Sequence, residues 1–380
     1  MWVSRMLVGA SLVLAHAACT RAPPEPEDLS RAELRKNADA RCEAANGISF
    51  HGRRRYVNGV NYAWREFGTD FGGLAAWGRG GVGGDAAKID ADLAAIAKSG
   101  ASVVRWWIFP ELRGDGLERE ATGEVPRVSA HALADLDRAL ELAEKHDLYV
   151  LFTLFSFDAF RLGADRIDLA PFVRDPHRVE AIGLRLVVPL VERAAQGRHA
   201  HRVFGWDLMN EPEWAVADLD QRNMCEAEGK ERTDCVSYGE MHWFLTRLSE
   251  LVAAHTQGLP ERKKPLVTIG AASPWEHRNW EAVPQDFRQY HFYEADYARG
   301  PLTLPTDEPS VIGEYPSWGL EATWNAPALD ARQLAFAIQD AGFAGGLGWT
   351  YNVQDAHTRW PALATATFAM AEARGCQARF

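Results

Sequence analysis

Basic residues are in short supply in this chain. Its 380 residues include 41 Lys and Arg against 52 Asp and Glu, a formal net charge of −11 at pH 7. Nucleic acids and anionic membrane surfaces are bound through clusters of positive charge, so this balance argues against both as partners. Long apolar runs are scarce as well, and the one near the N-terminus is too short to span a membrane.

Cysteine is also scarce, with five in the chain: Cys19, Cys42, Cys225, Cys235 and Cys376. An odd number leaves one over in an oxidising compartment. If Cys19 carries lipid, the other four pair evenly, and Cys225 with Cys235 then form a local bridge in a polar stretch. Cys42 and Cys376 remain, where a closed barrel would bring them together. Free buried thiols are the alternative, and the spacing fits no zinc pattern.

The N-terminal segment has the pattern of an export signal. Arg5 precedes an apolar stretch over residues 6–15, and small residues then lead to Ala17-Ala18-Cys19. This order of charge, apolar run and small residues predicts a secretory signal peptide over residues 1–18.

Two ways of processing this signal stay open. Ala15-His16-Ala17 suits ordinary signal peptidase, whereas Ala17-Ala18-Cys19 resembles a bacterial lipobox with His16 where Leu is usual. We favour the lipobox, because residues 19–44 include a stiff, proline-rich and charged spacer of the kind expected between a lipid anchor and a domain. The chain is therefore expected to be exported, as a cell-envelope lipoprotein anchored at Cys19 or as a secreted protein.

Short apolar segments alternate with helical patterns along the rest of the chain. Strands are expected at residues 56–62, 102–108, 148–155, 203–209, 266–270, 289–293, 310–314 and 346–351. Helices are expected at residues 85–99, 129–146, 177–196, 238–256, 329–341 and 361–374, with the fifth and sixth crossovers short or irregular. This alternation predicts the α/β class and a (β/α)8 TIM barrel, a single catalytic domain over residues 45–380. A doubly wound sheet is the alternative.

Two of the predicted strands end in glutamate. An apolar run from Phe204 reaches Asn210 and Glu211 before Pro212 stops it, and the strand at residues 310–314 ends in Glu314. The C-terminal ends of barrel strands converge on one face. Two carboxylates there are the minimum for cleaving a glycosidic bond, although either one alone could be a solvated loop carboxylate.

Other strands deliver polar or aromatic groups to the same face. The second carries Arg105, the sixth carries His291 and Tyr293 at alternate positions that point the same way, and the eighth carries Trp349. Each also has a purely structural interpretation. Arg105 could be a buried ion-pair partner, His291 a core histidine whose ring nitrogens are hydrogen-bonded, and Trp349 a side chain that fills the core.

Asn-Glu-Pro, His-x-Tyr, Gly-Glu and a late Trp, in this order, resemble glycoside hydrolase family 5, the cellulase superfamily of retaining (β/α)8 hydrolases. The resemblance covers the strand ends from Tyr56 to Tyr351. It implies an O-glycosyl hydrolase, like an endo-β-mannanase or cellulase, that cleaves β-linked glycans of mannan or β-glucan type by double displacement. Glu211 would be the acid/base and Glu314 the nucleophile, and no metal or cofactor is implied.

The resemblance also implies roles around these two glutamates. Asn210 would hydrogen-bond the sugar 2-hydroxyl, and Tyr293 would hold Glu314. Arg105 would lie behind the nucleophile and His291 near the acid/base. Trp349 would lie under the sugar in the subsite before the cut.

One departure from the family pattern concerns the third predicted strand. The family usually has a histidine at its end, whereas this chain has Phe155-Ser156-Phe157-Asp158. A related family of the same clan therefore stays open, as does the substrate.

Aromatic residues are plentiful, with 14 Trp in the chain. Aromatic faces stack on sugars, but they also fill cores and loops. Four tryptophans that follow predicted strands could be platforms further along a glycan: Trp64, Trp214, Trp275 and Trp318.

Two other functions are compatible with the fold. One is a catalytically silent glycan-binding lipoprotein, which would not need both Glu211 and Glu314. The other is a metal-dependent barrel hydrolase, which would need several ligands clustered at the barrel mouth. A monomer is expected in each case.

Overall fold

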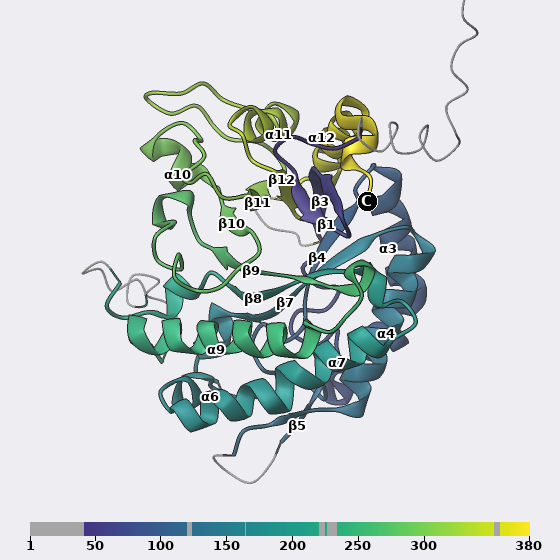
Figure 1. Ribbon diagram of the computed structural model, residues 1–380, viewed down its shortest axis with the longest axis vertical. Coiled ribbons are helices and arrows are strands. Elements are labelled where there is room, and N and C mark those ends of the chain that lie inside the picture. The colour runs from purple at the N-terminus through teal and green to yellow at the C-terminus, as the bar shows by residue number, and fades with distance from the viewer. Residues whose placement is uncertain (1–41, 120–123, 164, 220–224, 226–233, 353–357) are drawn as a thin grey trace, which may run out of the picture. The chain divides into compact units, whose positions relative to one another are not determined.

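Eight parallel strands close into a barrel, in the order β3-β4-β7-β8-β9-β10-β11-β12 and back to β3 (Figure 1). Their bounds are β3 Val57–Asn61, β4 Val103–Trp107, β7 Tyr149–Ser156, β8 Val203–Asn210, β9 Leu266–Ala271, β10 Arg288–His291, β11 Ser310–Pro316 and β12 Gly345–Trp349. Every predicted strand is present, with its ends displaced by at most two residues. The predicted (β/α)8 barrel is confirmed.

This computed structural model describes residues 42–119, 124–163, 165–219, 225, 234–352 and 358–380. The part from Cys42 to Phe380 forms one compact unit. The predicted signal peptide, the anchor at Cys19 and nearly all of the predicted spacer lie outside the described residues.

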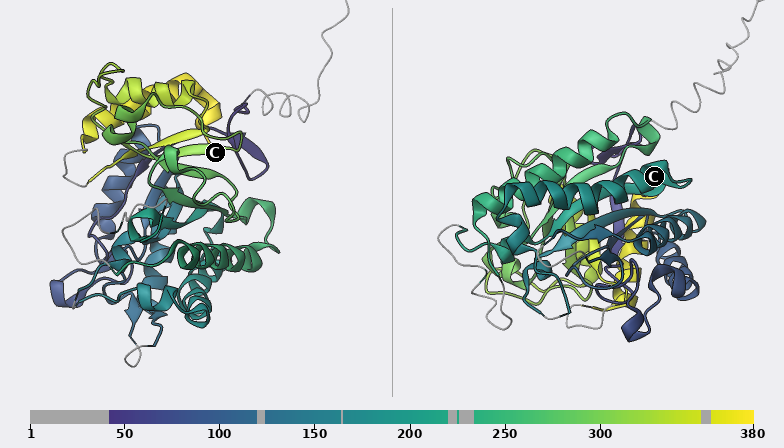
Figure 2. Two further views of the ribbon diagram at one scale, coloured as in Figure 1. Left: turned by 90° about the vertical axis from the view of Figure 1, so that its left-hand side faces the viewer. Right: turned by 90° about the horizontal axis from the view of Figure 1, so that it is seen from below.

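Helices cover the outside of the barrel (Figure 2). The longer ones are α3 Ala86–Lys98, α4 Ala130–Lys145, α7 Val188–Gln196, α9 Tyr238–Thr256, α11 Ala331–Asp340 and α12 Trp360–Arg374. Figure 1 shows α3 and α4 to the right of the strands and α11 and α12 above them. The leucines and alanines on the inner side of α4 are buried, which is why this amphipathic segment forms a helix here.

One predicted helix is not continuous. Residues 177–196 form α6 (Pro176–Ile182), a π-helical turn (Gly183–Val187) and then α7. Pro189 lies at the start of α7 and has no amide proton to donate, so the regular hydrogen-bond ladder is interrupted there.

The fifth and sixth crossovers are short, as predicted. A single 3-10 turn, Pro274–Glu276, lies between β9 and β10. Helix α10 (Glu294–Arg299), between β10 and β11, has six residues.

An antiparallel hairpin that the sequence analysis missed lies at the other end of the barrel. Its strands are β1 (Ile48–Phe50) and β2 (Arg53–Arg55). The hairpin's apolar side chains pack in one cluster with residues near the starts of barrel strands, among them Val57, Val103 and Phe204. The cluster fills the N-terminal end of the barrel, which leaves the opposite end for a site.

Both predicted disulfides are present. Cys42 bonds Cys376 with their Cα atoms 5.3 Å apart, and Cys225 bonds Cys235 with their Cα atoms 6.0 Å apart. The first joins the two ends of the compact unit. No helix in the described part of the chain combines the length and apolarity that crossing a membrane requires.

The two disulfides should differ in their effect on stability. Cys42–Cys376 closes a loop with a sequence separation of 334, against 10 for Cys225–Cys235. In the chain-entropy picture the longer loop restricts the unfolded chain more. Replacing Cys42 and Cys376 by Ser should lower the free energy of unfolding by roughly 2–5 kcal/mol, and replacing Cys225 and Cys235 should lower it less. Urea denaturation without reductant measures both, and an equal or larger loss for the short loop would contradict this.

Candidate active site

The chain leaves strand β8 through a constrained turn. Asn210 ends the strand, and Glu211 adopts a left-handed backbone with φ 46° and ψ 57°. The Glu211 amide donates to Gly270 O at 2.6 Å, and a 3-10 turn begins at Pro212. Few residues other than glycine adopt positive φ, and such positions often occur at functional sites. The turn directs the Glu211 carboxylate over the barrel mouth.

Glu314 lies within β11 rather than at its end, because the strand continues to Pro316. Its side chain is nearly buried, and both carboxylate oxygens accept hydrogen bonds. Arg105 Nη1 donates to Oε1 at 2.6 Å, and Tyr293 Oη donates to Oε2 at 2.9 Å. These contacts fix the orientation of the Glu314 carboxylate.

Arg105 is fully buried and binds a second carboxylate, that of Asp207 on β8. Its Nε and Nη2 donate to Asp207 Oδ2 at 2.9 and 2.7 Å, and Nη2 also donates to Asn210 Oδ1 at 2.9 Å. Asn61 Oδ1 accepts from Nη1 at 3.2 Å. A buried cation is tolerated only when it is paired and hydrogen-bonded, and two carboxylates and two amides meet that need here.

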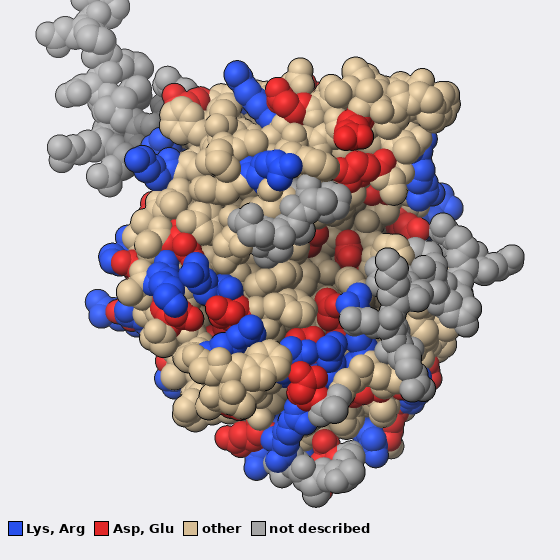
Figure 3. All heavy atoms as spheres, turned by 180° about the vertical axis from the view of Figure 1, so that it is seen from behind, with Lys and Arg blue, Asp and Glu red and all other residues tan. Residues whose placement is uncertain are grey.

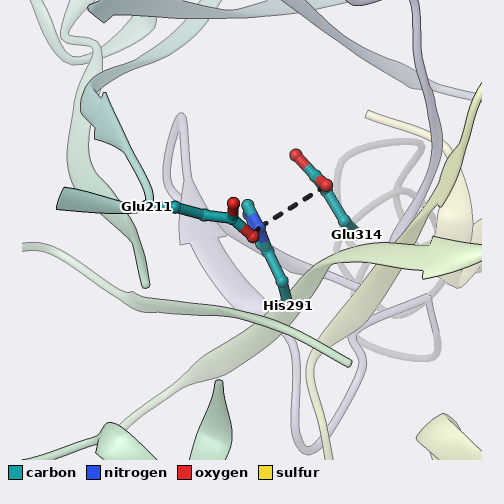
Figure 4. A group of neighbouring side chains, drawn as sticks. All are labelled: Glu211, His291 and Glu314. Carbon is teal, nitrogen blue, oxygen red and sulfur yellow. Dashed lines mark hydrogen bonds and ion pairs between the residues drawn. The ribbon is translucent and has the colours of Figure 1, made fainter. Parts of the chain in front are cut away.

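His291 is fully buried at the end of β10, between the two glutamates (Figure 4). Its Nδ1 lies 2.8 Å from Glu211 Oε1 and 3.5 Å from Glu314 Oε2. Burial lowers the pKa of His291 to about 4, since the charge of Glu314, which raises the pKa, does not offset burial and Arg105 lowers it further. The ring is therefore neutral near pH 7, and the tautomer that fits an ionised Glu211 carries its proton on Nδ1.

Burial also raises the pKa of the Glu314 carboxyl. The charges of His291 and Arg105 and the hydrogen bond from Tyr293 oppose that rise, while the charge of Glu211 adds to it. Loss of any opposing contact would raise the pKa of Glu314 further.

These groups border a pocket of about 670 Å³. Its lining includes the aromatic residues Trp64, Phe67, Trp107, Phe157, Trp214, Tyr293 and Trp349. Polar and charged residues complete it: Asp158, Arg161, Asn210, Glu211, Ser273, Glu276, Asp296, Arg299 and Glu314. Aromatic faces with a few convergent polar groups are typical of a site for a small polar ligand or a polymer segment.

The structure brings all seven residues predicted for the site together. Asn210, Glu211, Tyr293, Glu314 and Trp349 line the pocket, while Arg105 and His291 contact it from below through the hydrogen bonds above. The prediction of Tyr293 inside the sixth strand is wrong. Strand β10 ends at His291, and Tyr293 instead precedes α10, after a shift in register between Tyr290 and His291.

The four predicted aromatic platforms divide into two pairs. Trp64 and Trp214 line the pocket. Trp275 and Trp318 are outside the described lining of this pocket. Each is partly exposed under a guanidinium group, Arg299 over Trp275 and Arg359 over Trp318, both 5.3 Å from the ring centre.

Ser156 and Asp158 lie at the end of the third barrel strand, β7, in the region where the sequence departs from the resembled family. Ser156 Oγ donates to Asp158 Oδ2 at 2.8 Å. Arg161 Nη1 lies 3.2 Å from Asp158 Oδ1. Asp158 and Arg161 both line the pocket, so the departure predicted from the sequence lies in the site itself.

Asp207 and Trp107 are the main residues that the sequence analysis missed. Asp207 is a charged residue inside an apolar strand, and that contrast could have indicated a buried ion pair, although not which residue forms the other half of it. Trp107 follows Arg105 by two residues on β4 and therefore shares its face of the strand. Trp107 lines the pocket, and its indole Nε1–H is buried with no hydrogen-bond partner among the described residues.

No protein-family model matches the chain. Over 185 residues it is 23% identical to the mannan endo-1,4-beta-mannosidase of Mytilus edulis, covering 47% of each chain. The alignments span about half the length of the curated relatives that the chain matches.

Solved structures show the same fold over much more of the chain. The β-mannanase structure from the blue mussel Mytilus edulis has a TM-score of 0.65 at 15% identity, covering 85% of this chain and 95% of that one. The endo-1,4-β-mannanase structure from Eisenia fetida has a TM-score of 0.65 at 19% identity, covering 88% and 94%.

At these identities the solved structures show that the chain shares the (β/α)8 barrel fold. The fold and these two mannanases are consistent with the resemblance to glycoside hydrolase family 5 that the strand-end residues carry.

Gly270 on β9 is expected to be irreplaceable. A Cβ there would lie 2.8 Å from Arg105 Nη2, 2.8 Å from Gln289 Nε2 and 3.2 Å from His291 Nε2. The arginine cannot move away without breaking its hydrogen bonds to Asp207. Gly270→Ala should therefore cost roughly 1–3 kcal/mol of stability and most of the activity. Thermal unfolding and rate measurements test both effects.

Gly239 in α9 is the matched control, because a Cβ there meets nothing within 4 Å. Gly239→Ala should leave activity unchanged and stabilise the helix slightly. Equal behaviour of the two variants would contradict the account of Gly270.

Proposed function

We propose that this protein is a retaining glycoside hydrolase that cleaves β-linked glycans, with Glu314 as the nucleophile and Glu211 as the acid/base. One observation carries the proposal. Glu211, His291 and Glu314 each place one side-chain atom within 4.8 Å of the others. Carboxyl groups of retaining enzymes lie about 5–5.5 Å apart, whereas inverting enzymes leave about 6.5–9.5 Å for a water molecule.

In the first step, the Glu314 carboxylate attacks the anomeric carbon. The bond from that carbon to the leaving oxygen breaks, and Glu211 gives that oxygen its proton. Arg105 and Tyr293 hold the attacking carboxylate from two sides, so it needs little reorganisation as the new bond forms.

In the second step, Glu211 acts as a base and removes a proton from water. The water oxygen attacks the anomeric carbon from the face that the leaving group has vacated, and the ester bond to Glu314 breaks. Two displacements restore the starting configuration. The neutral His291 donates a hydrogen bond to the Glu211 carboxylate formed in the first step, without adding a charge.

A β-mannan is the substrate class that the comparisons support best. The curated relatives are mannan endo-1,4-beta-mannosidases, and the solved structures named above are β-mannanases. The aromatic residues along the pocket are consistent with a polymer bound through several sugars. We therefore propose endo-acting cleavage of β-mannan, with a β-glucan as the alternative polymer.

Export is part of the proposal. Two disulfides are typical of proteins that mature in an oxidising compartment. Acidic and basic side chains are interspersed on the face shown in Figure 3, which is consistent with an uncharged glycan as partner. A signal peptide over residues 1–18 and lipid at Cys19 would place the enzyme at the cell envelope.

Metal-dependent hydrolysis is a weaker candidate, even though Glu211, His291 and Glu314 could each offer a ligand atom. Both oxygens of Glu314 already accept hydrogen bonds, one of them from the Arg105 cation at 2.6 Å. A divalent ion would have to displace that contact and lie beside a buried positive charge. Activity on β-mannan should accordingly survive chelators.

Substitution of the two glutamates should separate their roles. Glu314→Gln should abolish turnover of every substrate, because no leaving group replaces the missing nucleophile. Glu211→Gln should lose about 10²–10⁴-fold on β-mannan but much less on aryl glycosides whose leaving groups need no proton. Initial rates on a panel of β-linked polysaccharides and on one activated aryl glycoside measure both.

Glu250 on the outer face of α9 gives a matched control, since it is an exposed carboxylate paired with Arg247. Glu250→Gln should behave as the unaltered protein on every substrate. Equal losses of Glu211→Gln on mannan and on the activated glycoside would refute the acid/base role.

A further inference from the structure

Asp296 is a buried carboxylate beside the site that the proposed mechanism does not use. It lies in α10, lines the pocket and is only 7% exposed. Its two oxygens have different partners. Oδ2 accepts the backbone N–H of Tyr293 at 3.1 Å, and Oδ1 accepts Ser273 Oγ at 2.5 Å.

The contact with Tyr293 fixes the start of α10. The amide of Asp296 donates back to Tyr293 O at 3.0 Å, so two hydrogen bonds join the residues in opposite directions. Such a reciprocal arrangement stabilises a helix start. Because α10 has only six residues, a contact at its first turn has a large share in defining where the helix begins.

Ser273 ties this helix start to a different strand. It follows β9, and its hydroxyl oxygen also accepts the Trp275 amide at 3.1 Å. The Ser273–Asp296 hydrogen bond therefore connects the β9–β10 loop to the segment that carries Tyr293. Both residues are buried, which shields the connection from water.

Tyr293 in turn contacts the nucleophile that we have proposed. Its hydroxyl donates to Glu314 Oε2 at 2.9 Å, and the preceding amide, that of Phe292, donates to Glu314 O at 2.9 Å. The backbone of residues 292–293 is thus attached to Glu314 on one side and to Asp296 on the other.

We propose that Asp296, braced by Ser273, is a positioning residue that holds the Tyr293 hydroxyl on the carboxylate of Glu314. This inference rests on the proposed function, because it concerns the residue assigned there as nucleophile. Asp296 acts through Tyr293 and makes no contact with the reacting atoms.

The charges around Asp296 make its hydrogen bond with the Tyr293 amide, through which it would position Tyr293, sensitive to pH. Ser273 and Glu276 face it from the β9–β10 loop, and Tyr293 and Arg299 face it from its own segment. Burial raises the pKa of Asp296 to about 6, against the hydrogen bonds from Ser273 and Tyr293 and the charge of Arg299, while Glu276 adds to the rise. As the pH falls through about 6, the protonated carboxyl accepts the hydrogen bond from the Tyr293 amide less well, so Tyr293 is held less firmly.

The test is a double-mutant cycle on Asp296→Asn and Tyr293→Phe, read on an activated aryl β-mannoside. Asp296→Asn should lower kcat about tenfold with little change in KM. In the Tyr293→Phe background it should have almost no further effect, because the hydroxyl through which it acts is gone. Additive losses, or a raised KM with unchanged kcat, would mean that Asp296 contacts the sugar directly and would overturn the proposal.

The direction of the pH shift separates positioning from simple electrostatics. Removing the negative charge of Asp296 would by itself lower the pKa of Glu314. Loosening the Tyr293 hydrogen bond raises that pKa instead, since this contact lowers it in the intact protein. The acid limb of kcat/KM should therefore move to higher pH in Asp296→Asn, as it should in Tyr293→Phe. A move to lower pH would contradict positioning.

Two further variants guard against a fold defect. Ser273→Ala keeps Asp296 and its bond to Tyr293, and should shift the acid limb in the same direction by less. Asp330→Asn removes an equivalent carboxylate at the start of α11, where Asp330 Oδ1 accepts the Gln333 amide at 2.8 Å. It should lower stability slightly and leave the acid limb unchanged. Far-UV circular dichroism confirms that each variant is folded.

A readout without turnover keeps this inference separate from the proposed function. The pKa of Glu314 can be followed by carboxyl ¹³C NMR, with Glu314→Gln identifying the signal. A higher pKa of Glu314 in the Asp296→Asn variant supports the positioning role of Asp296 even if no β-glycan is cleaved. An unchanged or lower pKa of Glu314 in that variant refutes the positioning role even if mannan is hydrolysed.

Discussion

The buried guanidinium of Arg105 is the interaction on which the site depends. It has no contact with solvent, and it is neutralised by Asp207 and Glu314 from two other strands. Removing either carboxylate would take away part of the pairing and hydrogen bonding that make a buried guanidinium tolerable. The barrel therefore fixes Glu314 as a consequence of accommodating Arg105, and catalytic geometry and stability are coupled at this point.

Several neighbouring features follow from that charge. Gly270 has no side chain because the guanidinium, Gln289 and His291 already occupy the space. The neighbouring cation and burial both favour a neutral His291. Asp207 also accepts the Gly270 amide at 2.9 Å and the Thr153 hydroxyl at 2.9 Å, so one carboxylate ties β7 and β9 to the arginine on β4. Outside this layer, aromatic side chains cover the charges and form the pocket.

Much of this was predictable from the sequence because barrel strands are short apolar runs whose C-terminal ends share one face. That rule was sufficient to predict the eight strands and to predict that Glu211 and Glu314 lie close together. It could not give Asp207 as the partner of Arg105, because pairing across strands depends on their register. It also misplaced Tyr293, where a register shift ends β10 early. The hydrogen bonds of Asp296 with Ser273 and Tyr293 join separate segments of the chain, and no local pattern in the sequence indicates such contacts.

The stereochemistry of the first product tests the central claim most directly. Proton NMR of a β-linked substrate during early hydrolysis distinguishes the two anomers before mutarotation mixes them. If Glu314 attacks and Glu211 protonates, the first-formed sugar keeps the β configuration. An α product would mean that water attacks the substrate directly, and it would contradict the assignment of Glu314 as the nucleophile.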